Sequence, residues 1–325
     1  MKKYLITGVA GFIASIVAEK LLDQGAMVVG LDNLNHAYDV RMKEYRLKKL
    51  KEFPGFTFLK LDVSDRNLLQ NKTLCGKNFD AVINLAARAG VRESLKDPWV
   101  YLDTNTTGTL NLLEFCRQEN ISKFLLASTS SIYGEDAPLP TPETATSDKP
   151  LQAYAASKKA AEAMAHAYHF LYGIDVSIVR YFTVYGPAGR PDMVMFRFSK
   201  WIQEDMPVHL FGDGEQSRGF TYVDDIARGT ISALKPVGYE IFNLGGHEVM
   251  TINELIAALE EKTGKRAEVV FHKKHPADMY TNQADISKAK SLLDWEPQVS
   301  LEEGIGKVVD WYLEERSWVK NIITD

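Results

Sequence analysis

The sequence predicts an α/β fold in which a doubly wound parallel sheet is followed by a smaller C-terminal α/β lobe. Short apolar runs alternate with helical patterns through the first 180 residues, which is typical of successive strand–helix–strand units. A glycine turn closes the first run, and later runs end in small or polar residues. Beyond Tyr181 the alternation breaks down. We therefore expect residues 1–180, with the sheet completed by 220–244, to form one domain, and 181–219 with 245–325 to form the lobe.

The expected strands are apolar runs too short to be helices, at 4–7, 27–31, 57–61, 80–85, 123–127, 175–180 and 240–244. Apolar residues at helical spacing predict helices at 11–23, 101–119, 154–172, 192–204 and 226–234. The lobe is expected to contain further elements at 251–262, 267–271, 285–292 and 301–312.

Composition excludes several classes of protein. The chain has 325 residues, 45% of them hydrophobic and 25% charged, as in ordinary globular proteins. A net charge of −5 argues against a nucleic-acid or anionic-membrane partner, and the basic run 41–51 is interpreted as a solvated helix face. The apolar N-terminal stretch is interrupted by polar residues and continues as an amphipathic helix, so we interpret neither it nor any other segment as a leader or membrane span. Two scattered cysteines, Cys75 and Cys116, favour the reducing cytoplasm.

The first strand, turn and helix have the arrangement of a dinucleotide-binding (Rossmann) unit. Gly8 permits a tight turn, Gly11 lets the backbone approach a pyrophosphate, and the helix N-terminus faces the phosphates. Ala14 occupies the third glycine position. Asp32 ends the second strand and would accept hydrogen bonds from the adenosine ribose while repelling a 2′-phosphate, so NAD is favoured over NADP. A glycine motif alone is weak evidence, but here strand, helix and acid are all in register.

Residues at later strand ends are candidates for the same crevice. Asp62 and Val63 would lie near the adenine, and the small residues of Leu85-Ala86-Ala87 would let the dinucleotide pass closely. Each of these also fits an ordinary strand terminus. Asn105, within the predicted helix 101–119, fits either a residue that holds backbone near the catalytic face or a plain helix contact.

A phenol and an ammonium four residues apart are the strongest catalytic candidates. Tyr154 and Lys158 share one helix face, and a neighbouring cation, either Lys158 or an oxidised nicotinamide, would lower the pKa of the phenol. The alternative is an alanine-rich helix with a packed tyrosine and a solvated lysine. Four hydroxyl residues, Ser128 to Ser131, end a central strand where they would meet a polar substrate or simply form a turn. The pairs His166/His169 and His272/His275 lack further ligands at suitable spacing, which argues against a metal site.

Several motifs together resemble the extended short-chain dehydrogenase/reductase family, and within it the nucleotide-sugar epimerases. They are Thr7-Gly8-x-x-Gly11-Phe12-Ile13, Asp32-Asn33, Leu85-Ala86-Ala87, Thr129 before Tyr133-Gly134, Tyr154-x-x-x-Lys158, Tyr222-Val-Asp-Asp225, Ala284-Asp-Ile-Ser-Lys288 and Trp295-x-Pro297. The resemblance covers nearly the whole chain. It implies a bound NAD, a UDP-sugar substrate, catalysis by Tyr154, Lys158 and Thr129, and a homodimer formed through helices 101–119 and 154–172.

Within the family, three segments make the chain most similar to enzymes that invert C4 of UDP-glucuronate. They are Ala87-Arg88-Ala89-Gly90-Val91-Arg92, Tyr181-Phe182-Thr183-Val184-Tyr185-Gly186-Pro187 and Gly189-Arg190-Pro191-Asp192-Met193. Ser131 stands where relatives that eliminate water or carbon dioxide carry an acid, and Thr183 where UDP-glucose 4-epimerases usually have asparagine. Epimerisation of UDP-glucose, decarboxylation of UDP-glucuronate and a catalytically silent NAD-binding scaffold remain alternatives.

The resemblance also assigns binding residues. Cofactor contacts fall to Gly8, Gly11, Phe12, Ile13, Asp32, Asn33, Asp62, Val63, Leu85, Ala86, Ala87, Asn105, Tyr154, Lys158 and Tyr181. Substrate contacts fall to Arg88, Ser130, Ser131, Thr183, Arg190, Phe211, Arg218 and Asp278, with Arg190 and Arg218 on the diphosphate. Three positions depart from the family pattern: Ala14 for glycine, Asn84 for histidine and Gly219 for aspartate.

Overall fold

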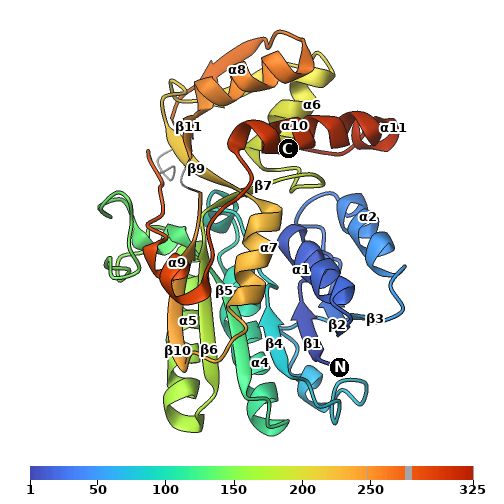
Figure 1. The fold of residues 1–325 in the computed structure, drawn as a ribbon. Coiled ribbons are helices and arrows are strands. Elements are labelled where there is room, and N and C mark those ends of the chain that lie inside the picture. Colours follow the sequence, from blue (N-terminus) through green and yellow to red (C-terminus); the bar gives the residue numbers. More distant parts are fainter. Residues whose placement is uncertain (247, 275–279, 325) are drawn as a thin grey trace.

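A seven-stranded sheet with every neighbouring pair parallel forms the centre of the molecule, in the order β10-β6-β5-β4-β1-β2-β3 (Figure 1). The computed structural model describes residues 1–246, 248–274 and 280–324. The strands are β1 Lys3–Thr7, β2 Met27–Asp32, β3 Phe56–Lys60, β4 Ala81–Asn84, β5 Lys123–Thr129, β6 Asp175–Tyr181 and β10 Tyr239–Leu244. This arrangement confirms the predicted doubly wound sheet.

Helices cover both faces of this sheet. Against one face lie α1 Phe12–Asp23, α7 Val223–Ser232 and α9 Ser287–Leu293, and against the other lie α4 Gly108–Gln118 and α5 Ala153–Tyr172 (Figure 1). Side chains alternate between the two cores, so Ile6 faces α1 while Leu5 faces the α4 side. The helix α2 Arg41–Leu50 packs beside α1 at the edge.

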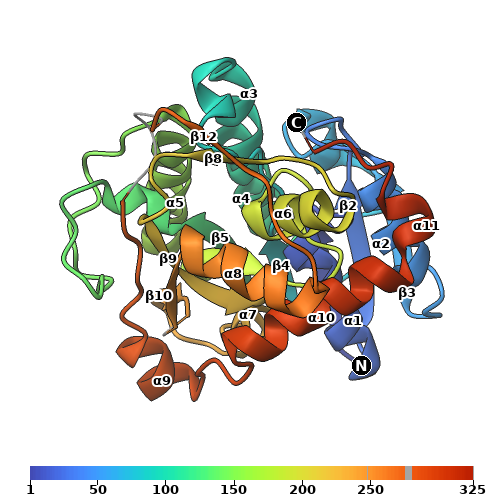
Figure 2. The same ribbon diagram turned by 90° about the horizontal axis from the view of Figure 1, so that it is seen from above.

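The second lobe sits over the carboxyl ends of the strands (Figures 1 and 2). It contains a small sheet of β7 Thr183–Tyr185, β9 Ser217–Tyr222 and β11 Val249–Thr251, and a parallel pair of β8 Val208–Phe211 and β12 Val269–His272. Its helices α6 Val194–Gln203, α8 Ile252–Thr263 and α10 Leu301–Glu314 enclose a separate apolar core. Within 220–244, β9 contributes to the small sheet, and only β10 joins the large one.

The predicted helix 101–119 is divided. A short helix α3 Trp99–Tyr101 passes into π-helical backbone at Leu102–Thr107 before α4 begins. Gly108 lies against Val63, where an added Cβ would come within 2.7 Å of the valine side chain. Because a π-turn shifts the register of a helix by one residue, the wide turn aims Asn105 inward. Three short segments form 3₁₀ helices in the described chain: η1 Arg66–Gln70, η2 Glu93–Leu95 and η4 Ser130–Tyr133.

The C-terminal segment ties the two lobes together. After α10 and α11 Arg316–Val319, the side chains of Val319 and Ile322 are fully buried against Met42 of α2 and Phe196 of α6. In the part of the chain that the structure describes, no helix has the length and apolar character needed to span a bilayer.

Candidate active site

A cavity of about 420 Å³ lies between the carboxyl ends of the sheet strands and the second lobe. Its walls include most of the residues that the sequence singled out. These are Gly8, Gly11, Phe12, Ile13, Asp32, Asn33, Asp62, Val63, Leu85, Ala86, Ala87, Thr129, Ser130, Ser131, Tyr154, Lys158, Tyr181, Thr183, Arg190 and Arg218. The cavity is therefore continuous from the glycine turn to the tyrosine and the hydroxyl cluster.

The glycine turn leaves room for an anion at the start of α1. Gly8 has a φ of +68°, and a Cβ there would meet the Ala86 backbone at 2.8 Å. Gly11 caps α1 and, as a glycine, has no side chain that could accept a hydrogen bond from the first N–H groups of the helix. A helix start of this kind, with backbone exposed by glycine, suits a pyrophosphate.

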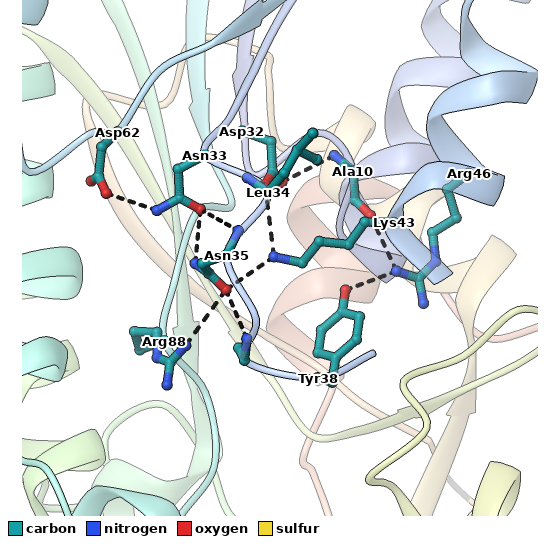
Figure 3. A network of polar contacts seen from close by, with 11 residues as sticks. Ala10, Asp32, Asn33, Leu34, Asn35, Tyr38, Lys43, Arg46, Asp62 and Arg88 are labelled. Atoms are coloured by element: carbon teal, nitrogen blue, oxygen red, sulfur yellow. Dashed lines mark hydrogen bonds and ion pairs between the residues drawn. The ribbon is translucent and has the colours of Figure 1, made fainter. Parts of the chain in front are cut away.

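A polar network surrounds Asp32 at one end of the cavity (Figure 3). The Asp32 carboxylate accepts hydrogen bonds from the backbone N–H groups of Ala10 (3.2 Å) and Leu34 (2.8 Å), and the Lys43 ammonium lies 3.8 Å away. Lys43 also donates to Asn35 Oδ1 at 3.0 Å. Burial lowers the pKa of Lys43, and the charge of Asp32 opposes that shift. The carboxylate is thus fixed in orientation and partly neutralised.

The network corrects in part the interpretation of the basic run 41–51 as a solvated face, because Arg41, Lys48, Lys49 and Lys51 are exposed as expected and two other cations are not. Lys43 and Arg46 are buried on the same side of α2 as Met42, Leu47 and Leu50. Arg46 donates to Tyr38 Oη (2.8 Å) and to backbone carbonyls at Ala10, Ala188 and Gly189. The two cations share the 3.6-residue spacing of the apolar residues, and that spacing was the available signal for their burial.

Asn33 continues the network toward the next strand. Its Nδ2 donates to Asp62 at 2.7 Å, and its Oδ1 accepts hydrogen bonds from the backbone and side-chain amides of Asn35 (Figure 3). Arg88 Nη1 lies 3.5 Å from Asn35 Oδ1. Sequence reasoning missed Asn35, Tyr38 and Lys43 as cavity residues.

Tyr154 stands where the cavity meets the hydroxyl cluster. Burial raises the pKa of its phenol, while a hydrogen bond with Thr129 and the charge of Arg190 act in the opposite direction. The sequence offered Lys158 or an oxidised nicotinamide as the source of the lowering charge. In the structure the Lys158 ammonium donates to the backbone carbonyl of Ala127 at 2.8 Å. The side chain at position 158 is buried, and desolvation lowers its pKa to about 8 against the opposing charge of Glu162.

The hydroxyl cluster forms a connected set. Thr129 Oγ1 donates to Ser131 Oγ and accepts from the Ser131 backbone N–H, both at 3.2 Å. Ser130 Oγ accepts from Asn282 Nδ2 at 3.0 Å. Ser128 Oγ is buried and finds no partner among the described residues.

Two arginines face the cavity from the second lobe. Arg190 pairs with Asp192 at 2.5 Å, and this pairing contributes to raising the pKa of the guanidinium although burial opposes it. Arg218 donates to the carbonyls of Ser217 (2.7 Å) and Tyr280 (3.1 Å).

Three predicted residues lie outside the cavity lining. Asn105 is buried, and its side-chain amide hydrogen-bonds to both the backbone N–H and the backbone carbonyl of Arg88. It also donates to Ser157 Oγ of α5, so it positions the backbone at Arg88 against that helix. The Arg88 side chain points to Asn35 of the network around Asp32 (Figure 3). Phe211 stacks on His272, with the Arg92 guanidinium 4.4 Å from its ring centroid. Asp278 and His275 lie outside the described residues, and within the described ones no cluster of His, Cys, Asp or Glu could hold a metal.

The family described as NAD dependent epimerase/dehydratase matches residues 4–245. The chain belongs to this family. A UDP-glucuronate 4-epimerase of Thermodesulfobacterium geofontis is 54% identical over 324 residues, covering 99% of both chains. Among solved structures, a Bacillus cereus UDP-glucuronic acid 4-epimerase in complex with UDP-glucuronic acid and NAD has a TM-score of 0.89 at 38% identity, covering 96% of this chain and 99% of that one. A UDP-glucose 4-epimerase of Thermotoga maritima with UDP-glucose also has a TM-score of 0.89, at 33% identity, covering 97% of this chain and 99% of that one.

The three departures from the epimerase family pattern have structural explanations. Ala14 is buried where α1 packs on the sheet. Asn84 is buried and bonded to Thr7 Oγ1 (2.8 Å) and Thr109 Oγ1 (3.0 Å). A Cβ at Gly219 would lie 3.1 Å and 3.2 Å from the carbonyl oxygens of Gly246 and Asn282, which leaves little room for a carboxylate.

Proposed function

We propose that this epimerase interconverts UDP-glucuronate and UDP-galacturonate by inverting C4 of the sugar, with NAD bound in the cavity. The observation that carries the proposal is the continuity of one cavity from the uncapped start of α1 to Tyr154, Thr129 and the serines of the hydroxyl cluster. The 54% identity to a UDP-glucuronate 4-epimerase supports the same substrate.

The residues present fit NAD. Gly8, Gly11 and the start of α1 would hold the pyrophosphate, Asp32 the adenosine ribose, and Asp62 with Val63 the adenine. Phe12, Ile13 and the small residues at 85–87 would line its path. When bound, the nicotinamide supplies the chemistry of removing a hydride from the sugar carbon and returning it. The domain formed by residues 1–180 and 220–244 would hold the cofactor. The lobe formed by residues 181–219 and 245–325 would hold the nucleotide sugar.

Tyr154 would accept the proton of the C4 hydroxyl and later give it back. Its buried phenol needs positive charge and hydrogen bonding to ionise, and Arg190 and Thr129 supply both. Lys158 would hold the backbone at Ala127 through its hydrogen bond to the Ala127 carbonyl, and it would add a buried positive charge to the same wall of the cavity. Thr129 would also hydrogen-bond the reacting oxygen and fix its position.

The hydroxyl cluster would hold the sugar carboxylate. Oxidation at C4 makes a β-keto acid, which loses carbon dioxide when the bond to the carboxylate stands perpendicular to the ketone plane. Ser130, Ser131 and Thr183 would hold the group away from that geometry by hydrogen bonding. Ser131 also leaves the cluster without the acid that elimination chemistry uses. Arg190 and Arg218 would neutralise the diphosphate.

UDP-glucose is the second candidate substrate, since the Thermotoga maritima relative is a UDP-glucose 4-epimerase. Comparing kcat/KM for UDP-glucuronate and UDP-glucose tests the proposal. We expect the acidic sugar to be favoured, with UDP-galacturonate as product and no NAD added. A preference for UDP-glucose would overturn the assignment of substrate, and UDP-xylose as main product would show decarboxylation instead.

We also infer a cytoplasmic homodimer. The cytoplasm would keep Cys75 and Cys116 reduced. Large apolar side chains are exposed along the outer helical layer at Trp99, Leu102, Phe170 and Leu171, which a second copy packed through α4 and α5 would cover. Light scattering on the purified protein should give the mass of two chains, and Phe170→Asp should reduce it to one. A monomeric wild type would contradict the dimer without affecting the assigned reaction.

A further inference from the structure

Asn282 occupies a position that the reaction as described leaves unused. It lines the wall between the main cavity and a smaller cavity of about 230 Å³ bordered by the 133–141 loop. Its Nδ2 donates to Ser130 Oγ at 3.0 Å, while its Oδ1 is buried with no partner among the described residues. An amide oxygen buried without a donor costs free energy, so a ligand hydroxyl at this place would be stabilised.

The segment that carries Asn282 is held from both sides. The carbonyls of Tyr280 and Asn282 accept from the backbone of β9 at Ser217 (3.0 Å) and Gly219 (2.7 Å), and the carbonyl of Gln283 accepts from Thr141 at 2.9 Å. The absence of a side chain at Gly219 permits this close approach, since a Cβ there would lie 3.2 Å from the Asn282 carbonyl. The glycine at position 219 therefore suits the close packing of β9 against the segment that carries Asn282.

The direction of the hydrogen bond matters for the substrate. Because Ser130 Oγ accepts the Asn282 N–H, the Ser130 hydroxyl keeps its own proton free to donate to another acceptor. A carboxylate needs donors and repels acceptors, so a serine with a free hydroxyl proton favours an acidic sugar over a neutral one.

We propose that Asn282 is a specificity-determining positioning residue that orients the Ser130 hydroxyl toward the sugar carboxylate and offers its own Oδ1 to a sugar hydroxyl. The inference rests on the proposed function, since it requires that UDP-glucuronate is the substrate. It adds to that function a residue of the second lobe that selects the charge of the sugar.

The test is the pair of variants Asn282→Asp and Gln283→Glu, which add the same charge at neighbouring positions of the chain. Asn282→Asp removes the donor to Ser130 and places an anion beside the carboxylate. We expect its KM for UDP-glucuronate to rise about tenfold or more, the affinity for UDP alone to stay unchanged, and the acidic-to-neutral ratio of kcat/KM to fall by a similar factor. Release of carbon dioxide from UDP-glucuronate should increase. Gln283→Glu should leave the ratio within about twofold of wild type.

Asn282→Ala guards against a variant that fails to fold. It introduces no charge and should lower the ratio by a smaller factor, with thermal melting close to wild type. An unchanged ratio in folded Asn282→Asp, or an equal fall in both charge variants, would overturn the inference while leaving the proposed function intact. Failure of the wild type to act on UDP-glucuronate would instead refute the proposed function.

Discussion

The Lys43 ammonium lies 3.8 Å from the Asp32 carboxylate, and both side chains are 6% exposed. Among the described residues drawn in Figure 3, Lys43 is the only buried cation in contact with Asp32. Asp32 is the acid that we expect at the cofactor ribose. We therefore expect cofactor choice to depend on the balance of one negative charge against Lys43 and the nearby Arg88.

Removing the negative charge should weaken discrimination against NADP. In Asp32→Asn the hydrogen bonds to Ala10 and Leu34 can be retained in part, while Lys43 and Arg88 lose the opposing charge. We expect the NAD-to-NADP affinity ratio of cofactor-stripped protein, measured by titration calorimetry, to fall about tenfold or more, because a 2′-phosphate is no longer repelled. Asp65→Asn, the same change at an exposed turn, should leave the ratio unaltered. A ratio that does not move in Asp32→Asn would place the ribose elsewhere.

Tyr154→Phe should lower turnover by roughly two to four powers of ten, because the proton acceptor is lost while the ring remains. Product formation followed by chromatography gives the rate, and thermal melting confirms that the fold is kept. Tyr172→Phe, on the exposed end of α5, is the matched control and should be as active as wild type. Turnover above a tenth of wild type in Tyr154→Phe would exclude the assigned role.

Lys158 predicts an alkaline limit to activity. Its folded pKa of about 8 lies below the ordinary 10.5, so the ammonium is lost as the pH rises through 8. We expect kcat to fall above that pH, and Lys158→Arg, which stays charged, to lack this limb. The sign for stability is the reverse, because burial of the ammonium opposes folding below pH 8 and that penalty disappears as the pH rises toward 10.5. A wild-type kcat that is flat to pH 10 would show that the charge of Lys158 is not needed.

Ile322→Ala tests the C-terminal segment that joins the lobes. The side chain is fully buried between α2 and α6, so its loss should reduce the free energy of unfolding by roughly 2 to 3 kcal/mol, toward the low end for core isoleucines because a terminus can relax. Ile323→Ala removes a neighbouring side chain that is 64% exposed and should change stability by less than about 0.5 kcal/mol. Equal effects in denaturant titration would mean that the segment does not bind the lobes together.

The strands and the NAD motif could be predicted because both depend on local pattern. The glycines at 8 and 11 and the acid at 32 lie within about 30 residues of one another. The strands are apolar runs that follow a simple alternation with helical patterns. The sequence pattern did not show that the helix 101–119 is divided. The π-turn lies where Asn105 contacts Arg88 and Ser157, which come from other parts of the chain.

The candidate site shows the same limit. Tyr154, Lys158 and Thr129 are recognisable by type and spacing, yet a charge that lowers the pKa of the phenol belongs to Arg190, which the fold brings from the second lobe. Lys43 was interpreted as solvated because its neighbours in sequence are basic, although its burial follows from the face it shares with Met42 and Leu47. Asn282 carries no motif at all and is identified by its place in the fold, where it lines the cavity and contacts Ser130.

The central claim is that the hydrogen removed from C4 of the sugar returns to the same carbon. UDP-glucuronate labelled with deuterium at C4 tests this claim directly. Purified protein without added cofactor should convert it to UDP-galacturonate with the deuterium still on C4, as followed by nuclear magnetic resonance. Loss of the label to solvent, or a labelled UDP-pentose in place of the epimer, would contradict the account.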